Sequence, residues 1–261
     1  MNGVKLKDLE IIVPTTKEVR QPKPNGFSLF PQYHAFCCLL LGMRHSGKST
    51  AIYNILARTL SYRDIVFIFC STVDTDKSWQ PIKNLLNEYG VEFVCDSSPF
   101  GKQAGVKYDH VADILNNFEG NPELLKNRRL FCIFDDMPKK FLRHESVENL
   151  IKRGRHINCN IIISTQSFAD LSPPERMNLE YLFVFKNIPR AKIEKLYEDL
   201  SITEVSSDRF QHYYSEITRD DGLSKHNFMY IGRNPFVIRK NLNIQYNISR
   251  SGEEKTDTDS E

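Results

Sequence analysis

The sequence contains an eight-residue pattern typical of phosphate-binding loops. Residues 42–49 read Gly-Met-Arg-His-Ser-Gly-Lys-Ser and match G-x-x-x-x-G-K-[ST] at every position. In this pattern backbone N–H groups surround phosphate oxygens, the Lys reaches the terminal phosphates, and the Ser binds Mg²⁺. Lys48 and Ser49 are therefore predicted to contact phosphates and Mg²⁺. The predicted nucleotide-binding residues are Gly42, Met43, Arg44, His45, Ser46, Gly47, Lys48, Ser49 and Thr50.

Two acidic residues provide the second candidate for chemistry. Asp135 and Asp136 directly follow the apolar run 130–134, which reads as a buried strand. Ligands bind at the carboxyl ends of strands in open α/β sheets. Asp135 fits a Mg²⁺-holding role opposite Ser49, and Asp136 stands where a general base is needed. Two adjacent carboxylates repel each other, and a bound Mg²⁺ would relieve that repulsion.

A third polar position follows another predicted strand. Residues 160–164 form an apolar run that ends at Thr165 and Gln166. A polar side chain at such a strand end can contact the γ-phosphate or orient the attacking water, and glutamine suits the second task. Gln166 is equally compatible with an ordinary strand end. We nevertheless take it as a candidate catalytic residue.

The surrounding elements fit what a phosphate-binding loop requires. The apolar run 35–41 suits a buried parallel strand, and 50–60 shows helical spacing of apolar residues. Together they give strand, glycine loop and helix, and the helix N-terminus adds its own attraction for anions. Further strands are predicted at 65–70, 91–95, 130–134, 160–164 and 181–185, separated by helical segments, with a hairpin at 227–231 and 236–238.

Together with the phosphate-binding loop, this alternation predicts an α/β fold of the P-loop NTPase type, with a mainly parallel sheet flanked by helices. The 65–70 strand lies between the P-loop strand and the acid strand, which fits the P-loop division with an extra strand between the two. The chain shows neither N-K-x-D nor D-x-x-G, so a GTPase is disfavoured. Residues 1–33 are predicted to be a leader with a strand at 9–13, 34–249 the ATPase domain, and 250–261 a disordered acidic tail.

Charge and composition limit the other possibilities. The net charge is +2, but the tail 251–261 holds five acids and one Lys, or −4, which leaves +6 on the remaining 250 residues. A moderately basic body fits a polyanionic partner. The six cysteines form no C-x-x-C pair, so no zinc site is predicted and buried thiols in a reducing compartment are expected. No apolar stretch reaches the length of a membrane span, which predicts a soluble protein.

A basic segment, Lys-Arg-Gly-Arg-His at 152–156, precedes the 160–164 strand. Its cations suit the end of a helix, where they complement the dipole. An alternative is that one arginine reaches a neighbouring subunit's nucleotide as an arginine finger. The residues alone leave these two interpretations open.

Several segments of the chain resemble the viral genome-packaging ATPases of the FtsK–HerA superfamily. These segments are Gly154-Arg155-His156, the 160–164 strand, Gln166 and Leu-Ser-Pro-Pro-Glu-Arg-Met-Asn at 171–178. The resemblance extends from about Phe36 to Leu200. It implies an ATPase with a RecA-like, ASCE-type sheet that uses ATP and Mg²⁺. This ATPase would assemble as a homo-oligomeric ring, either hexamer or pentamer, and drive double-stranded DNA into a preformed capsid. It also implies a capsid vertex protein as partner.

The resemblance also implies roles for individual residues. Lys48 contacts phosphates, Ser49 and Asp135 hold Mg²⁺, Asp136 is the catalytic acid, Gln166 the polar sensor and Arg155 the finger acting in trans, with Arg153 and Arg176 as alternatives. The superfamily commonly has Asp-Glu where this chain has Asp-Asp, so the water position would differ. No nuclease domain is recognisable, which disfavours packaging by cutting concatemers. The implied location is the host cytoplasm or a viral factory, with virion association as an alternative.

A DNA motor also needs basic surfaces that grip the phosphate backbone. The candidates are Lys139, Lys140 and Arg143 after the acid strand, and the predicted loop 97–109 with Lys102, Gln103 and Lys107. Alternative functions are a P-loop nucleoside or small-molecule kinase, a DNA translocase or helicase that does not package, and a nucleotide-gated scaffold for virion assembly.

Overall fold

In the computed structural model, residues 3–5, 35–126, 128–222, 226–246 and 248 are described. Ten strands form one sheet in the order β1-β12-β11-β10-β9-β2-β8-β7-β3-β4. The strands of this sheet are β1 (Gly3–Lys5), β2 (Cys37–Leu41), β3 (Ile65–Cys70), β4 (Glu92–Asp96), β7 (Leu130–Asp135), β8 (Cys159–Thr165), β9 (Tyr181–Phe185), β10 (Phe228–Arg233), β11 (Phe236–Lys240) and β12 (Ile244–Tyr246). From β9 to β4 neighbouring strands are parallel, whereas β10, β11, β12 and β1 join by antiparallel pairing.

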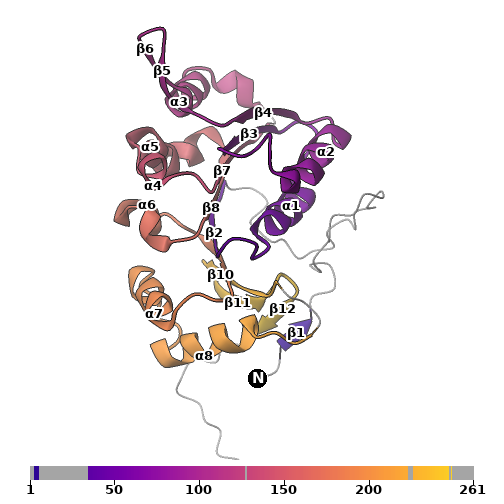
Figure 1. The fold of residues 1–261 in the computed structure, drawn as a ribbon, viewed down its shortest axis with the longest axis vertical. Coiled ribbons are helices and arrows are strands. Elements are labelled where there is room, and N and C mark those ends of the chain that lie inside the picture. The colour runs from indigo at the N-terminus through magenta and orange to yellow at the C-terminus, as the bar shows by residue number, and fades with distance from the viewer. Residues whose placement is uncertain (1–2, 6–34, 127, 223–225, 247, 249–261) are drawn as a thin grey trace, which may run out of the picture.

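Helices cover both faces of the sheet (Figure 1). On one face lie α1 (Lys48–Thr59) and α2 (Gln80–Glu88). The other carries α3 (His110–Gly120), α4 (Lys139–Leu142), α5 (Glu145–Arg153), α6 (Pro173–Met177), α7 (Arg190–Asp199) and α8 (Ser207–Thr218). The short 3₁₀ helices are η2 (Lys77–Trp79), η3 (Pro122–Leu125), η4 (Gly154–Ile157) and η5 (Phe168–Asp170).

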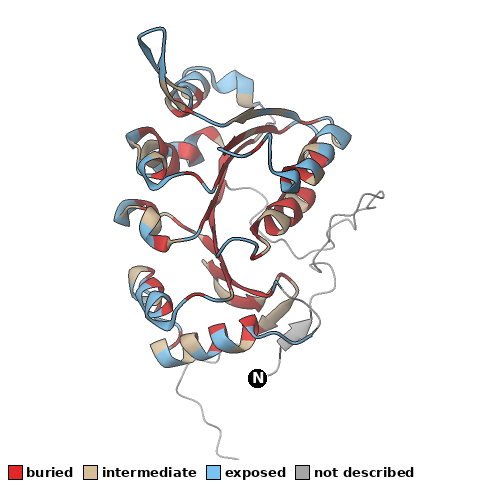
Figure 2. Cartoon of the chain, in the orientation of Figure 1, coloured by how far each residue is buried: buried red, intermediate tan, exposed pale blue. Residues whose placement is uncertain are grey.

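Burial on both faces explains the unbroken apolar runs of the central strands. In β2, Cys37, Leu39 and Leu41 join the core under α3, α5 and α7, whereas Cys38 and Leu40 join the core under α1 and α2. Figure 2 shows the sheet as a continuous buried layer between partly exposed helices. Full burial of each such leucine stabilises the fold by about 1.5–3 kcal/mol. The predicted α/β class and mainly parallel sheet are therefore confirmed.

The order of the central strands corrects one expectation. The strand between β2 and β7 is β8, not the 65–70 strand, which forms β3 on the outer side of β7. Order along the chain does not fix order in space, because each parallel crossover can pass over a neighbouring position. As a result, the end of β8 lies directly between the P-loop strand and the acid strand. Leu41 pairs with Thr165, and Asp135 pairs with Ser164.

The predicted loop 97–109 is mostly a hairpin. Strands β5 (Phe100–Gln103) and β6 (Val106–Asp109) pair antiparallel around Ala104 and Gly105, both in the left-handed backbone region, with φ of 50° and 83°. The hairpin projects beyond the body of the protein at the top of Figure 1, and most of it is exposed in Figure 2. The sequence analysis missed it because its strands lack alternating apolar residues.

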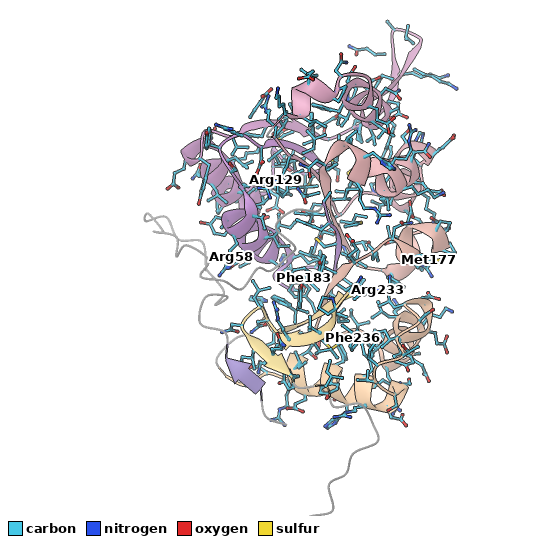
Figure 3. The ribbon with its side chains drawn as sticks, turned by 180° about the vertical axis from the view of Figure 1, so that it is seen from behind. Arg58, Arg129, Met177, Phe183, Arg233 and Phe236 are labelled. Atoms are coloured by element: carbon cyan, nitrogen blue, oxygen red, sulfur yellow. The ribbon has the colours of Figure 1, made fainter. Side chains whose placement is uncertain are left out.

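The antiparallel extension is tied to the core by an arginine. Arg233 at the end of β10 donates hydrogen bonds to the carbonyl oxygens of Met177 (3.2 Å), Leu179 (2.8 Å) and Leu200 (3.2 Å). Figure 3 shows Arg233 beside Met177. The pairing of the strands shows in addition that the predicted hairpin near the C-terminus is the middle of a longer extension. This extension also includes β1 from the predicted leader.

Several predictions concern residues beyond this description. The 9–13 strand and the acidic tail lie outside the described residues.

All six cysteines are free thiols, and every one except the half-buried Cys95 is buried, as expected. Within the described part of the chain, no helix is both long and apolar enough to cross a bilayer.

Candidate nucleotide-binding site

The loop between β2 and α1 has the close turns that its glycines permit. A side chain at Gly42 would lie 2.5 Å from Ser46 Oγ and 2.8 Å from Phe185 Cβ, which leaves no room for a Cβ atom. Gly47 has φ of 101°, a left-handed conformation that other residues rarely adopt. The helix α1 then begins at Lys48. The loop therefore leads into α1 in the tight conformation that a phosphate-binding loop at a helix N-terminus requires.

The loop lysine is held in place by contacts within the protein. Lys48 is 6% exposed, and its Nζ donates hydrogen bonds to the carbonyl oxygens of Gly42 (2.9 Å) and Met43 (3.3 Å). It also forms an ion pair with Asp136 Oδ1 at 3.6 Å. This contact joins the two predicted halves of the site across the strand β8.

The first acid is buried without a full set of partners. Asp135 at the end of β7 is 7% exposed, and among the described atoms its Oδ1 has no hydrogen-bond partner. Burial raises the pKa of Asp135 to about 6, and the negative charge of Asp136 adds to the effect. A buried carboxylate with a free oxygen lacks a cation. Asp135 therefore fits a Mg²⁺ site.

The second acid has a different environment. Asp136 stands in the left-handed backbone region with φ of 46°, and its side chain is 39% exposed. Its carboxylate faces Lys48 rather than Asp135's unpaired oxygen. The two adjacent acids therefore have different environments, one buried at the end of β7 and one exposed and paired with Lys48.

The loop and the acids share one cleft of about 660 Å³. Its lining is Arg44, His45, Ser46, Gly47, Lys48, Ser49, Thr50, Ser71, Thr72, Thr75, Asp76, Ser78, Asp135, Asp136, Gln166 and His226. The structure thus brings Gln166 together with the loop and both acids. Gly42 and Met43 are not part of the lining, and they serve the site through their carbonyl contacts with Lys48.

Two contributions to the cleft were missed by sequence reasoning. One is the segment after β3, where Ser78 Oγ lies 3.4 Å from Ser49 Oγ and Asp76 Oδ1 accepts the Ser78 N–H at 2.8 Å. The cluster of Ser, Thr and Asp at 71–78, directly after a buried strand, was an available signal. The other is His226, just before β10. No pattern in the sequence links His226 to the loop, because only the antiparallel return of β10 places it there.

The donor set fits Mg²⁺, which is usually bound by one or two carboxylates together with substrate phosphates and water. Ser49 and Asp135 supply such oxygens in the cleft. In the part of the chain that the structure describes, no group of three or more His, Cys, Asp or Glu side chains could hold a metal alone. Such an ion would therefore depend on the nucleotide for its remaining ligands.

The three candidate arginines lie away from this cleft. Arg155 is exposed in η4 at the amino end of β8, whereas the cleft is at the carboxyl ends of the strands. Arg153 forms an ion pair with Glu119. Arg176 Nη1 pairs with Asp199 Oδ2 at 2.5 Å. Within one subunit, none of them lines the described cleft.

The basic DNA-binding candidates also differ from one another. Lys139 and Lys140 in α4 are exposed, as are Lys102, Gln103 and Lys107 on the β5–β6 hairpin. Arg143 instead donates hydrogen bonds to the carbonyl oxygens of Ala169 (2.7 Å) and Asp170 (3.1 Å). Arg143 therefore fastens α4 to η5, a structural task that sequence inspection did not anticipate.

The fold and the cleft define a P-loop ATPase. A family model described as Poxvirus A32 protein matches residues 32–249, and the chain belongs to this family. That membership confirms the predicted kinship with viral genome-packaging ATPases.

Relatives and solved structures show a wider circle of similarity. Uncharacterized protein 075L of Invertebrate iridescent virus 6 is 23% identical over 187 residues, which cover 70% of this chain and 66% of that protein. Uncharacterized protein 088R of Invertebrate iridescent virus 3 is 22% identical over 222 residues, 83% of this chain and 75% of that protein. The genome packaging NTPase B204 from Sulfolobus turreted icosahedral virus 2, in complex with ATP-gammaS, has a TM-score of 0.48 at 15% identity, covering 82% and 98% of the two chains.

Proposed function

We propose that this chain hydrolyses MgATP in the cleft and uses the energy to move double-stranded viral DNA into a preformed capsid. The observation that carries the proposal is the joining of loop, acid pair and Gln166 in one cleft of an A32-family chain. A kinase would need an acceptor pocket beside the phosphates, and the cleft's acid pair supports water as the acceptor instead.

The residues of the cleft divide the reaction between them. Lys48 and the N–H groups of the loop bind the phosphates, and Ser49 and Asp135 would hold Mg²⁺. When bound, that ion neutralises negative charge on the transferred phosphoryl group. Gln166 orients the attacking water, and Asp136 accepts its proton. Asp136 must first leave Lys48, with which it pairs at 3.6 Å.

A ring of identical subunits, hexameric or pentameric, would complete the site. Arg155 lies at the sheet edge opposite its own cleft and is exposed, which supports a role for it in a neighbouring subunit's cleft. The engagement of Arg153 and Arg176 in ion pairs makes them weaker candidates. A capsid vertex protein would receive such a ring.

The DNA contacts are proposed on exposed basic side chains. Lys139 and Lys140 follow the acid pair by a few residues, so their position depends on β7, which carries Asp135. Lys102 and Lys107 lie opposite each other on the projecting hairpin. Contacts of this kind bind phosphates without reading sequence. A location in the host cytoplasm or a viral factory follows from the same proposal.

The decisive experiment measures phosphate release with and without duplex DNA, together with the oligomeric mass. We expect duplex DNA to stimulate hydrolysis by a multimer, and Lys48→Ala to abolish it through lost phosphate contacts. A monomer whose turnover is indifferent to DNA across salt concentrations would contradict the proposal. Transfer of the γ-phosphate to a nucleoside would indicate a kinase, and binding without turnover a nucleotide-gated scaffold.

A further inference from the structure

The cleft has two flanks on either side of the P-loop strand β2. On one flank β8 and β7 carry Gln166, Asp135 and Asp136. The other flank consists of β9, which pairs with β2, and the antiparallel β10 beyond it. The label of β10 lies below that of β2 in Figure 1. Phe228 at the start of β10 pairs with Phe185 at the end of β9, so the chain enters β10 at the same sheet edge as the P-loop. His226 lies at this entry.

His226 lies directly against the P-loop. A Cβ atom added to Gly47 would be 3.0 Å from His226 Cβ and 3.3 Å from its Cγ. The imidazole is nevertheless exposed, and it lines the cleft together with Lys48 and Thr50. His226 is therefore packed against Gly47 at its Cβ and Cγ atoms and also belongs to the lining of the cleft.

An amide pair, the buried Asn227 and the half-buried Asn241, holds the backbone beside His226. Asn227 is 1% exposed, and its Nδ2 donates to the Arg219 carbonyl oxygen at 3.0 Å. Its Oδ1 accepts a hydrogen bond from Asn241 Nδ2 at 3.1 Å, and Asn241 Oδ1 accepts the Phe228 N–H at 3.1 Å. Buried polar groups satisfied in this way fix a single arrangement. These contacts hold the backbone that precedes β10 and so help to position the neighbouring His226.

We propose that His226 stacks on the base of the bound nucleotide. The terminal phosphate must face Gln166 and Asp136, because those side chains act on it. The nucleoside then extends toward the opposite flank, where His226 presents a flat aromatic ring. Stacking of a base on such a ring tolerates any base, since every base has a π-face. This inference rests on the proposed nucleotide-dependent function and adds a nucleoside contact that the phosphate-binding motif lacks.

The test compares a nucleotide with a ligand that has phosphates only. Affinities of ATP, GTP and inorganic tripolyphosphate are measured for the full chain and for His226→Ala. We expect about a tenfold loss of affinity for both ATP and GTP, and unchanged affinity for tripolyphosphate. His226→Phe keeps an aromatic face and should recover most of the lost affinity. The matched control is His212→Ala, which removes an exposed histidine of α8 that pairs with Glu216.

Each other outcome has a definite meaning. Unchanged ATP affinity in His226→Ala overturns the inference, as does an equal loss for ATP and tripolyphosphate, which would indicate a phosphate contact. Failure of His226→Phe to recover affinity overturns stacking. If the unaltered chain binds ATP but duplex DNA leaves hydrolysis unchanged, the packaging proposal fails while the His226 comparison still stands. If the unaltered chain binds no nucleotide, both fail.

Discussion

Two buried aspartates lie at opposite edges of the same sheet and have opposite surroundings. Asp64 precedes β3 at the amino edge and is 2% exposed, and Arg129 Nη2 pairs with its Oδ2 at 2.7 Å while Arg129 Nε pairs with its Oδ1 at 3.2 Å. Asp135 ends β7 at the carboxyl edge, also buried, with its Oδ1 unpartnered among the described atoms.

The two carboxylates differ in their hydrogen-bond partners. The well-paired Asp64 fits a role in stabilising the fold, and the poorly paired Asp135 fits a role in binding a ligand. At the amino edge both carboxylate oxygens have cationic or N–H donors, since the Ser61 N–H also donates to Asp64 Oδ2 at 2.7 Å. At the carboxyl edge Asp135 Oδ2 accepts a weak, 4.0 Å hydrogen bond from the thiol of Cys70, and no cationic side chain forms an ion pair with Asp135 among the described residues. A buried carboxylate left so poorly paired costs stability until a cation arrives.

The largest expected effect concerns Arg155 at the amino edge, which we propose to act in the cleft of a neighbouring subunit. Arg155→Ala should lower the hydrolysis rate about 10³-fold, the lower end for loss of an arginine finger. Because Arg155 lies away from its own cleft, mixing Arg155→Ala with Lys48→Ala subunits should restore activity at mixed interfaces. Steady-state phosphate release measures this complementation. Its absence at every mixing ratio would exclude action in trans.

The next effect separates the two acids of the carboxyl edge. Asp136→Asn should lower hydrolysis about 10²-fold through loss of a general base, with MgATP affinity largely retained. Single-turnover hydrolysis and equilibrium nucleotide binding measure the two quantities. Normal turnover in this variant would show that Asp136 is not the base.

The amino-edge aspartate should matter for stability instead. Asp64→Asn removes the buried charge that Arg129 pairs with, and we expect a loss of about 2 kcal/mol in the free energy of unfolding. Arg129 is 30% exposed, so water softens the cost. Urea denaturation measures it. A change below about 0.5 kcal/mol would mean that the pair contributes nothing to the fold.

The same substitution at the other edge should have the opposite sign. Asp135→Asn, without nucleotide or metal, should raise the free energy of unfolding by about 1–2 kcal/mol at pH 8. The folded-state pKa is raised to about 6 from an ordinary 3.8, so the folded state holds the proton more strongly. The unaltered chain therefore loses stability as pH rises from about 4 to 6, and the variant lacks that loss. Equal pH profiles for both proteins would contradict the assignment.

Features with a local sequence signal could be predicted, whereas features that arise only when distant strands pair could not. The loop 42–49 and Asp135 were predictable because local pattern and strand ends carry their signals. The Asp64–Arg129 pair was not, since the two residues are joined only when β3 and β7 become neighbours. His226 likewise depends on the antiparallel return of β10. The 100–109 hairpin was missed because its strands lack the periodicity of a buried sheet.

The contact between Lys48 and Asp136 has a consequence for timing. The charge of Lys48 is shared between loop carbonyls and this carboxylate. An arriving phosphate competes for the same ammonium group, and as it wins, the carboxylate loses its partner and becomes available to water. We therefore expect nucleotide binding to free Asp136 for its proposed role as general base in hydrolysis. Lys48 thus holds Asp136 until a nucleotide binds, which couples the release of the general base to nucleotide binding.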